Sequence, residues 1–173
     1  KIQRPNLSRI TKNDFFILKI VCHVMDGFLP LFYKLYPRVK ELESFIDEEL
    51  DYILEAQSLV KFNKQADIVK DSIRGPYYYP EYSTSKILTM EYIEGWSLSE
   101  ILDAQKENNR DILSKLKLFN YDPNHIIKTI SFHCIKVAHL YSYYHADPHL
   151  GNIIITPKGK IRFIDFGLIG EVT

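Results

Sequence analysis

The sequence predicts a helix-rich α+β fold, and three observations predict it. Several long segments carry apolar residues at the spacing of a helix. Shorter segments, such as 160–164, alternate polar and apolar residues as strands do. Two polar motifs, HADPHLGN at 145–152 and IDFG at 164–167, lie beyond the last long helical segment. The motifs therefore fall where short strands and loops are expected.

Length and composition place the chain among ordinary globular proteins. It has 173 residues, of which 46% are hydrophobic and 25% are charged. Twenty-two basic and 22 acidic residues cancel, so the overall charge gives no reason to expect a nucleic-acid partner. Cys22 and Cys134 are far apart in sequence and form neither a disulfide framework nor a zinc-ligand spacing.

The first elements are a strand end and a helix. Residues 1–5, KIQRP, resemble the end of a strand. A helix is expected to start near Thr11 and to end at Gly27 or Pro30. Its apolar residues at helical spacing are Ile17, Val21, Val24 and Phe28. Two interpretations stay open, a helix packed on protein and a helix lying on a membrane, and base rates favour protein packing.

A second helix is expected over about 39–64. Its apolar stripe consists of Ile46, Leu50, Ile53 and Val60. The composition then changes to a turn-rich, aromatic segment over 75–96. Two β-like runs are expected inside it, at 77–82 and 86–92.

Two helix starts follow. Ser97 and Glu100 have the spacing of a capping box, so a helix should begin there. Residues 105–121 have the composition of a polar surface segment. Asp122 and Pro123 then suit the cap and the first position of another helix. That helix should bury Ile127, Ile130, Cys134, Val137 and Tyr141.

The polar motifs contain the residue types of a phosphoryl-transfer site. Asn152 begins a strand–turn–strand segment with Gly159 in the turn, and the second strand leads into Asp165. Asp165 and Asn152 offer the hard oxygen ligands that Mg²⁺ prefers. Asp147 lies where a catalytic-loop carboxylate would orient the nucleophile. Either motif alone is weak, whereas both in this order, joined by a hairpin, indicate a kinase-type site.

Such a site also needs a cation on the nucleotide phosphates, held by a carboxylate. We expect Lys1, at the strand end, to pair with Glu55 on the second helix. On a regular helix Asp51 and Glu55 would share a face, whereas Glu49 and Asp51 would point to different faces. Glu49 is therefore expected to face something other than the Lys1 pair.

Five strings in order, KIQRP, EELDYILEAQ, ILTMEYIEG, HADPHLGN and IDFGLIG, resemble the UbiB/ADCK family of atypical protein-kinase-like proteins. The resemblance covers nearly the whole chain. It implies an incomplete two-lobed, protein-kinase-like fold, with extra helices between the strand lysine and its helix glutamate. Residues 1–93 would be the remainder of the small lobe with the hinge, and 94–173 the start of the large lobe.

The resemblance also implies a role for each matching residue. Lys1 and Glu55 would act on the ATP phosphates, and Glu49 and Asp51 match the Glu-x-Asp signature of the family. Met90 would guard the adenine pocket, with Glu91, Tyr92 and Ile93 as the hinge. The catalytic and metal positions would be Asp147, Asn152 and Asp165, with ATP and Mg²⁺ as cofactors.

The implied function is ATP-dependent phosphoryl transfer or hydrolysis that supports prenylquinone biosynthesis. Expected partners are membrane lipid or a prenylquinone precursor and lipid-biosynthesis proteins. The expected location is a bacterial membrane, a mitochondrion or a plastid. Two departures from the family pattern are Leu150, where proline is common, and Ser58, where asparagine is common.

The sequence further resembles a piece of a longer protein, so the 173-residue stretch is not expected to be active alone. A catalytically weak nucleotide-binding scaffold is the alternative function. An aminoglycoside-type small-molecule kinase shares the His-x-Asp and Asp loops but does not account for KIQRP or ELDYxxEA.

Overall fold

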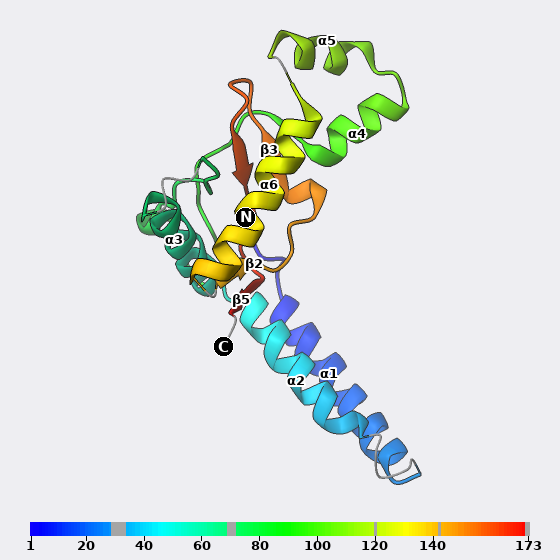
Figure 1. The fold of residues 1–173 in the computed structure, drawn as a ribbon. Coiled ribbons are helices and arrows are strands. Elements are labelled where there is room, and N and C mark those ends of the chain that lie inside the picture. The colour runs from blue at the N-terminus through cyan, green and yellow to red at the C-terminus, as the bar shows by residue number, and fades with distance from the viewer. Residues whose placement is uncertain (29–33, 69–71, 120, 142, 172–173) are drawn as a thin grey trace. The chain divides into compact units, whose positions relative to one another are not determined.

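The computed structural model describes residues 1–28, 34–68, 72–119, 121–141 and 143–171 (Figure 1). The chain packs as two units. Unit 1 contains Lys1–Leu54 and Pro80–Leu88, and unit 2 contains Glu55–Tyr79 and Thr89–Thr173. Among the helices in these described ranges, none has both the length and the apolar content that a bilayer span requires. The division into units leaves the expected lobe boundary at residues 93 and 94 a prediction.

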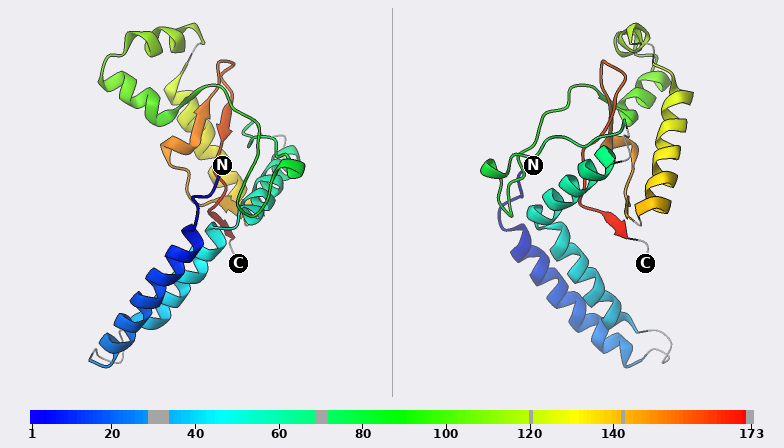
Figure 2. Two further views of the ribbon diagram at one scale, coloured as in Figure 1. Left: turned by 180° about the vertical axis from the view of Figure 1, so that it is seen from behind. Right: turned by 60° about the vertical axis from the view of Figure 1, so that its left-hand side comes forward.

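Unit 1 is built on a hairpin of two helices, α1 (Leu7–Asp26) and α2 (Leu35–Glu49), which lie side by side in Figures 1 and 2. Their small shared core consists of Phe15, Cys22 and Val39. At the end of α1, the Asp26 carboxylate accepts hydrogen bonds from the backbone N–H groups of Leu35 (2.7 Å) and Tyr36 (3.0 Å). These bonds lower the pKa of Asp26 and supply α2 with the N-terminal acceptor it otherwise lacks.

Two predictions about α1 are wrong. The helix begins at Leu7 rather than at Thr11, whose hydroxyl instead donates to the Leu7 carbonyl (2.9 Å). The residues expected to form its apolar stripe, Ile17, Val21, Val24 and Phe28, are exposed. The face that packs on α2 contains Phe15 and Cys22, so protein packing is confirmed for that face only.

The prediction of a single helix over about 39–64 is wrong as well. The chain forms α2 and a separate helix, α3 (Tyr52–Ile68). Between them the Asp51 carboxylate accepts the Ile53 N–H (2.9 Å), as an N-cap side chain does. Asp51 therefore precedes α3, and Glu49 ends α2, so the regular-helix geometry expected for Glu49, Asp51 and Glu55 does not apply.

The strand end at the start of the chain is confirmed as a short antiparallel pairing within unit 1. Ile2 forms a bridge with Ile87. The Leu88 N–H donates to the Lys1 carbonyl (2.9 Å), and the Gln3 N–H donates to the Lys86 carbonyl (2.9 Å). Before this pairing the chain makes one turn of 3₁₀ helix, η1 (Pro80–Tyr82), where part of a β-like run was expected.

Unit 2 contains two small antiparallel sheets. In the first, β3 (Ile153–Ile155) lies between β1 (Trp96–Ser97) and β4 (Ile161–Phe163). The second pairs β2 (Tyr143–His145) with β5 (Ile169–Glu171). The predicted strand–turn–strand is confirmed as β3 and β4, with Gly159 in the turn at a φ of 69°.

The helices of unit 2 follow the predictions in part. The Ser97–Glu100 capping box is confirmed at the start of α4 (Leu98–Lys106), and α6 (Pro123–Tyr141) begins at Pro123 as expected. The segment 105–121, expected to be a polar surface segment, contains the helix α5 (Arg110–Leu118), capped by Asn109, which was not predicted. On α6 the residues turned inward include Ile126, His133 and Val137, whereas Ile127 is 61% exposed.

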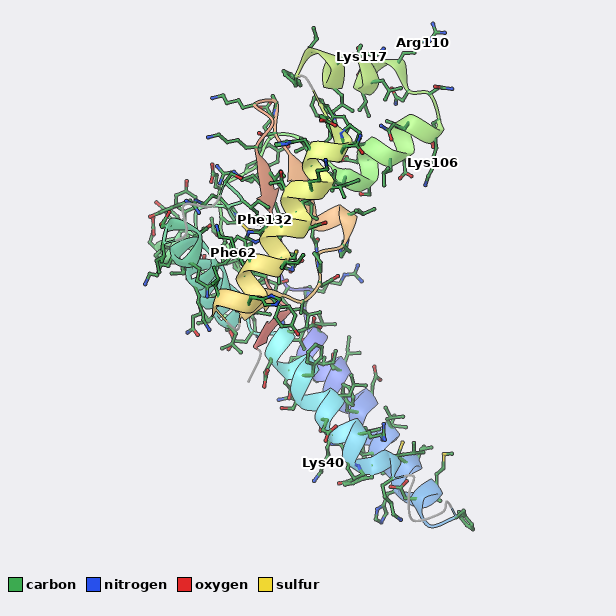
Figure 3. The ribbon with its side chains drawn as sticks, in the orientation of Figure 1. Lys40, Phe62, Lys106, Arg110, Lys117 and Phe132 are labelled. Atoms are coloured by element: carbon green, nitrogen blue, oxygen red, sulfur yellow. The ribbon has the colours of Figure 1, made fainter. Side chains whose placement is uncertain are left out.

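The core of unit 2 lies where α3, α6 and β4 meet. The Phe62 ring, labelled on α3 in Figure 3, stacks on Phe163 of β4 at 5.8 Å and meets His133 of α6 edge-on at 5.5 Å. The right-hand view of Figure 2 shows the β3–β4 hairpin between these two helices. This core supports the segment that follows β4, which contains Asp165.

Gly95→Ala should destabilise the full-length protein by about 2–4 kcal/mol, because it combines backbone strain with a clash. Gly95 has a φ of 155°, and an added Cβ would lie 2.3 Å from the Ile155 carbonyl oxygen of β3. Gly159→Ala is the matched control, since its φ is also positive but the space around it is open; it should cost about 1 kcal/mol. Equal losses in chemical denaturation would contradict the role of Gly95.

Candidate active site

Two antiparallel ladders hold the Asp165-Phe166-Gly167 segment from both sides. Before it, β4 pairs with β3, and the Ile164 N–H donates to the Asn152 carbonyl (3.0 Å). After it, the Ala146 N–H donates to the Leu168 carbonyl (3.0 Å), and β5 pairs with β2. The first ladder brings Asn152 to one side of Asp165, and the second brings the residues just before Asp147 to the other.

The three predicted polar residues of this site are partly exposed, as a site open to substrate requires. Asp165 Oδ1 accepts the Gly167 N–H (3.2 Å), which fixes one orientation of the carboxylate. The Asp147 Oδ2 atom lies 4.0 Å from Nε2 of His149. The 3₁₀ turn η2 (Leu150–Asn152) is capped by His149, whose Nδ1 accepts the Gly151 N–H (3.0 Å). Local bonds therefore order the loop between Asp147 and Asn152.

The donor set fits a magnesium ion that is shared with a nucleotide. Mg²⁺ in such sites takes one or two carboxylates and completes its shell with water and phosphate oxygens. Asp165 would supply a carboxylate and Asn152 an amide oxygen. In the described part of the chain, no group of three or more His, Cys, Asp and Glu side chains could hold a metal by itself. A cation here would take one oxygen from each of Asp165 and Asn152, with phosphate and water oxygens beside them.

Glu55 reaches the same segment from α3. Its side chain is 6% exposed, and its Oε1 accepts the backbone N–H of Phe166 (3.2 Å). A buried carboxylate is costly unless hydrogen bonds compensate for the lost water, so this contact fixes α3 against the Asp165 segment. Lys1 belongs to unit 1 and Glu55 to unit 2, so the Lys1–Glu55 pair stays a prediction.

His145 contacts the backbone of Asp165 from the side of the buried core. Its ring is buried against Phe163 and Phe166, and its Nε2 contacts the Asp165 carbonyl oxygen. A carbonyl only accepts, so Nε2 must carry the hydrogen, and Nδ1 has no hydrogen-bond partner among the described residues. Burial lowers the pKa of His145, although the Asp165 carbonyl and the carboxylates of Asp165 and Asp147 oppose that shift. The ring is therefore a neutral donor.

Asn63 and Gly75 connect α3 to the strand that precedes Asp165. Asn63 Oδ1 accepts the Gly75 N–H (2.8 Å), and its Nδ2 donates to the Pro76 carbonyl (3.1 Å). Next to Gly75, the Arg74 carbonyl accepts the Phe163 N–H of β4 (3.1 Å). A Cβ on Gly75 would lie 2.4 Å from Leu59 and 2.7 Å from Phe166, so glycine permits this close approach.

The expected hinge residues continue a short β pairing. Met90 bridges Tyr78, and the Glu91 N–H donates to the Tyr77 carbonyl (2.8 Å). The Tyr77 N–H in turn donates to Oε2 of Glu91 (3.0 Å). Beyond the hinge, Trp96 pairs with Ile155 of β3, so the same sheet carries the hinge exit and the Asn152 turn. The adenine contacts expected of Met90, Glu91, Tyr92 and Ile93 stay a prediction.

Sequence reasoning missed three residues that shape the site. His145 stands two positions before Asp147, and that spacing could have indicated its role. Asn63 and Gly75 gave no such signal, because they are twelve residues apart and neither belongs to a recognisable motif. Their importance comes from tertiary contacts alone.

Comparisons with known proteins identify a family that matches the chain. A family model described as the ABC1 atypical kinase-like domain matches residues 1–173. The chain is 30% identical, over 174 residues, to Protein ACTIVITY OF BC1 COMPLEX KINASE 3 of Arabidopsis thaliana chloroplasts. It is also 30% identical, over 171 residues, to an uncharacterised chloroplastic aarF domain-containing protein kinase of the same plant. Each alignment covers 99% of the chain but 22% of the relative.

One solved structure shows a similar fold. It is the complex of Rv3197 with erythromycin from Mycobacterium tuberculosis, with a TM-score of 0.69 and 23% sequence identity. The match covers 99% of this chain and 39% of the other. The expected fold class, an incomplete kinase-like α+β fold rich in helices, is confirmed, as is the family that the motifs indicated.

Asn63→Leu should destabilise the full-length protein by about 1–3 kcal/mol, because it leaves the buried Gly75 N–H without an acceptor. Gln57→Leu, an exposed position on the same helix, serves as the control and should change stability by less than about 0.5 kcal/mol. Chemical denaturation measures both. A loss for Asn63→Leu no greater than that of the control would show that the bond to Gly75 is not needed.

The stability of the protein should fall as the pH is lowered through the ordinary histidine range, and His145 should contribute to that fall. Its pKa is lowered in the folded protein from the ordinary histidine value of 6.5. Acid therefore protonates the unfolded chain first and favours unfolding. His145→Gln keeps an Nε2–H donor and cannot titrate. Denaturation at pH 7 and pH 5 should therefore show a smaller loss for the variant. The same loss in both proteins would contradict a buried neutral His145.

Proposed function

Because this chain belongs to the ABC1 atypical kinase-like domain family, we propose that it carries the metal- and nucleotide-binding residues of an ATP-dependent phosphoryl-transfer site. The observation that carries the proposal is the Asp165-Phe166-Gly167 segment. It is bonded to Glu55 on α3 and flanked by the ladders that lead to Asn152 and Asp147. A magnesium ion bound there would neutralise charge on the transferred phosphoryl group.

Each residue of the proposed site then has a specific role. Asp165 and Asn152 would hold the cation through their side-chain oxygens. Asp147 would accept or orient the proton of the attacking hydroxyl or water. Glu55 would keep the backbone of Phe166 in place and, paired with Lys1, direct an ammonium group at the phosphates. Met90 and the segment Glu91–Ile93 would border the adenine.

We further propose that the whole protein uses this site as a kinase or an ATPase that supports prenylquinone-type lipid biosynthesis, with a small or lipid-like acceptor. This part rests on the resemblance of the motifs, and the chain spans about a fifth of the length of its plant relatives. A nucleotide-binding scaffold would not require a carboxylate at Asp147. The presence of Asp147 with Asn152 and Asp165 therefore favours an enzyme.

Asp165→Asn should lower ATP turnover by at least about 10²-fold, because the amide cannot replace the negative charge on the cation. The assay is ADP release by the full-length protein with Mg²⁺ and lipid vesicles. Asp103→Asn, on the exposed surface of α4, is the matched control and should leave turnover unchanged.

Thermal unfolding of both variants shows whether each is folded. If Asp165→Asn folds and keeps the turnover of the wild type, Asp165 does not hold the metal and the proposed function fails. If the wild type releases no ADP while binding ATP, the scaffold interpretation replaces the enzyme.

A further inference from the structure

One residue, His149, contacts both the carboxylate proposed to orient the attacking group and the turn that carries a proposed metal ligand. It lies in unit 2, in the segment 146–152 that connects β2 to β3 (Figure 1). The His149 carbonyl accepts the Asn152 N–H (2.9 Å), and its Nδ1 accepts the Gly151 N–H (3.0 Å). On the other edge of the ring, Nε2 lies 4.0 Å from Oδ2 of Asp147. A single residue thus connects Asp147 to Asn152.

The bond from Gly151 determines which nitrogen of the His149 ring carries the hydrogen. A backbone N–H only donates, so Nδ1 must accept and is unprotonated. In a neutral imidazole the hydrogen then lies on Nε2, which is the atom that faces Asp147. His149 therefore directs an N–H donor at one oxygen of the carboxylate. A carboxylate held through one oxygen keeps a fixed orientation and presents its other oxygen to a ligand.

The backbone between the two side chains has little freedom. Pro148 fixes its own φ at about −65° and restricts Asp147 to extended conformations. His149 is extended as well, with a φ of −67° and a ψ of 154°. The separation of 4.0 Å between Nε2 and Oδ2 is longer than a hydrogen bond. Contacts of this kind in active sites often shorten when substrate binds, and a restricted backbone lowers the entropy lost in that step.

Gly151 permits the observed position of the ring because it has no side chain. A Cβ at this residue would lie 2.8 Å from Cε1 and 3.1 Å from Nδ1 of His149. The imidazole is a movable side chain, so it would turn away from an added methyl group. Nε2 would then leave Oδ2 of Asp147. Gly151 thus controls the contact without taking part in it.

The contact is too exposed to be explained by folding stability. The side chains of His149 and Asp147 are 57% and 45% exposed, and water weakens pairs of this kind. Its position, next to the residue proposed to orient the nucleophile, indicates a role in the reaction.

We propose that His149 is a positioning residue for phosphoryl transfer. Its Nε2–H would hold Oδ2 of Asp147, so that Oδ1 faces the attacking hydroxyl or water. Through the turn that it caps, His149 would also keep this carboxylate at a set distance from Asn152 and hence from the metal. His149 itself would neither gain nor lose a proton. This inference rests on the proposed function, because it assigns a role within that same site.

Two substitutions separate the two edges of the ring. His149→Asn keeps an acceptor, Oδ1, near the position of Nδ1 but has no donor that reaches Asp147. In the ADP-release assay with full-length protein, it should lower kcat about 10- to 100-fold, which corresponds to one hydrogen bond to a charged group. The KM for ATP should stay within about twofold of the wild type. His149→Gln places an amide N–H near the position of Nε2 and should restore at least about threefold of the lost kcat.

Gly151→Ala offers a second route to the same effect and should also lower kcat, because it displaces the ring. Asparagine has no Cε1 for the added methyl group to meet. The double variant Gly151→Ala/His149→Asn should therefore be no slower than His149→Asn alone. Losses that multiply in the double variant would overturn the proposal, since Gly151 would then act independently of the ring.

The matched control is His125→Asn, an exposed histidine on α6, which should leave kcat unchanged. Thermal unfolding and the binding of ADP with Mg²⁺ are measured for every variant. Wild-type kcat in His149→Asn, or equal losses in the Asn and Gln variants, would overturn the proposal. A loss of kcat that accompanies weaker ADP binding and a lower melting temperature would show a structural role only and would overturn it as well.

The tautomer of His149 tests the contact without any turnover. Long-range ¹H–¹⁵N spectra of the full-length protein should show the Nε2–H tautomer, and Asp147→Asn should move that resonance. An Nδ1–H tautomer, or a resonance that Asp147→Asn leaves in place, would overturn the proposal. A wild type that releases no ADP would instead contradict the proposed enzyme, while the spectrum would still show whether His149 directs its N–H at Asp147.

Discussion

The arrangement of the site depends on how the chain fixes the backbone around Asp165. Three bonds do this from three directions. The Glu55 carboxylate accepts the Phe166 N–H, His145 contacts the Asp165 carbonyl, and the Asn152 carbonyl accepts the Ile164 N–H. All three act on the main chain rather than on the Asp165 side chain. The position of the carboxylate, whose Oδ1 also accepts the Gly167 N–H, is thereby set before a ligand arrives, which is how preorganised sites lower the cost of reaction.

The same bonds tie the site to the core of unit 2. The side chain of Phe166 is buried in this core. Its ring centroid lies 5.0 Å from that of Phe62 and 5.4 Å from that of His145. Gly75 makes room for that ring, and Asn63 holds Gly75 to α3. A change in α3 would therefore be transmitted to Asp165 through packed side chains and two hydrogen bonds. Core packing and site geometry cannot be altered independently here, because interiors of this density do not deform smoothly.

Local signals in the sequence predicted several elements of the fold, whereas the roles of the site residues stay a prediction. The capping box at Ser97, the Asp122-Pro123 start of α6 and the turn at Gly159 are set by neighbouring residues, and the structure confirms them. The break at Asp51 was missed because a continuous apolar stripe concealed it, and α5 was not predicted because its polar composition indicated only a surface segment. Which face of α1 is buried depends on where α2 packs. Periodicity along one helix does not contain that information. The Asn63–Gly75 bond likewise depends on a tertiary contact that local sequence does not specify.

We propose that Asp165 and Asn152 bind the same cation. The most direct measurement is a crystal structure of the full-length protein with Mg²⁺ and ADP. We predict electron density for a metal within about 2.1 Å of a side-chain oxygen of each residue and of a phosphate oxygen. A metal that touches neither side chain, or a nucleotide bound away from the Asp165-Phe166-Gly167 segment, would contradict it.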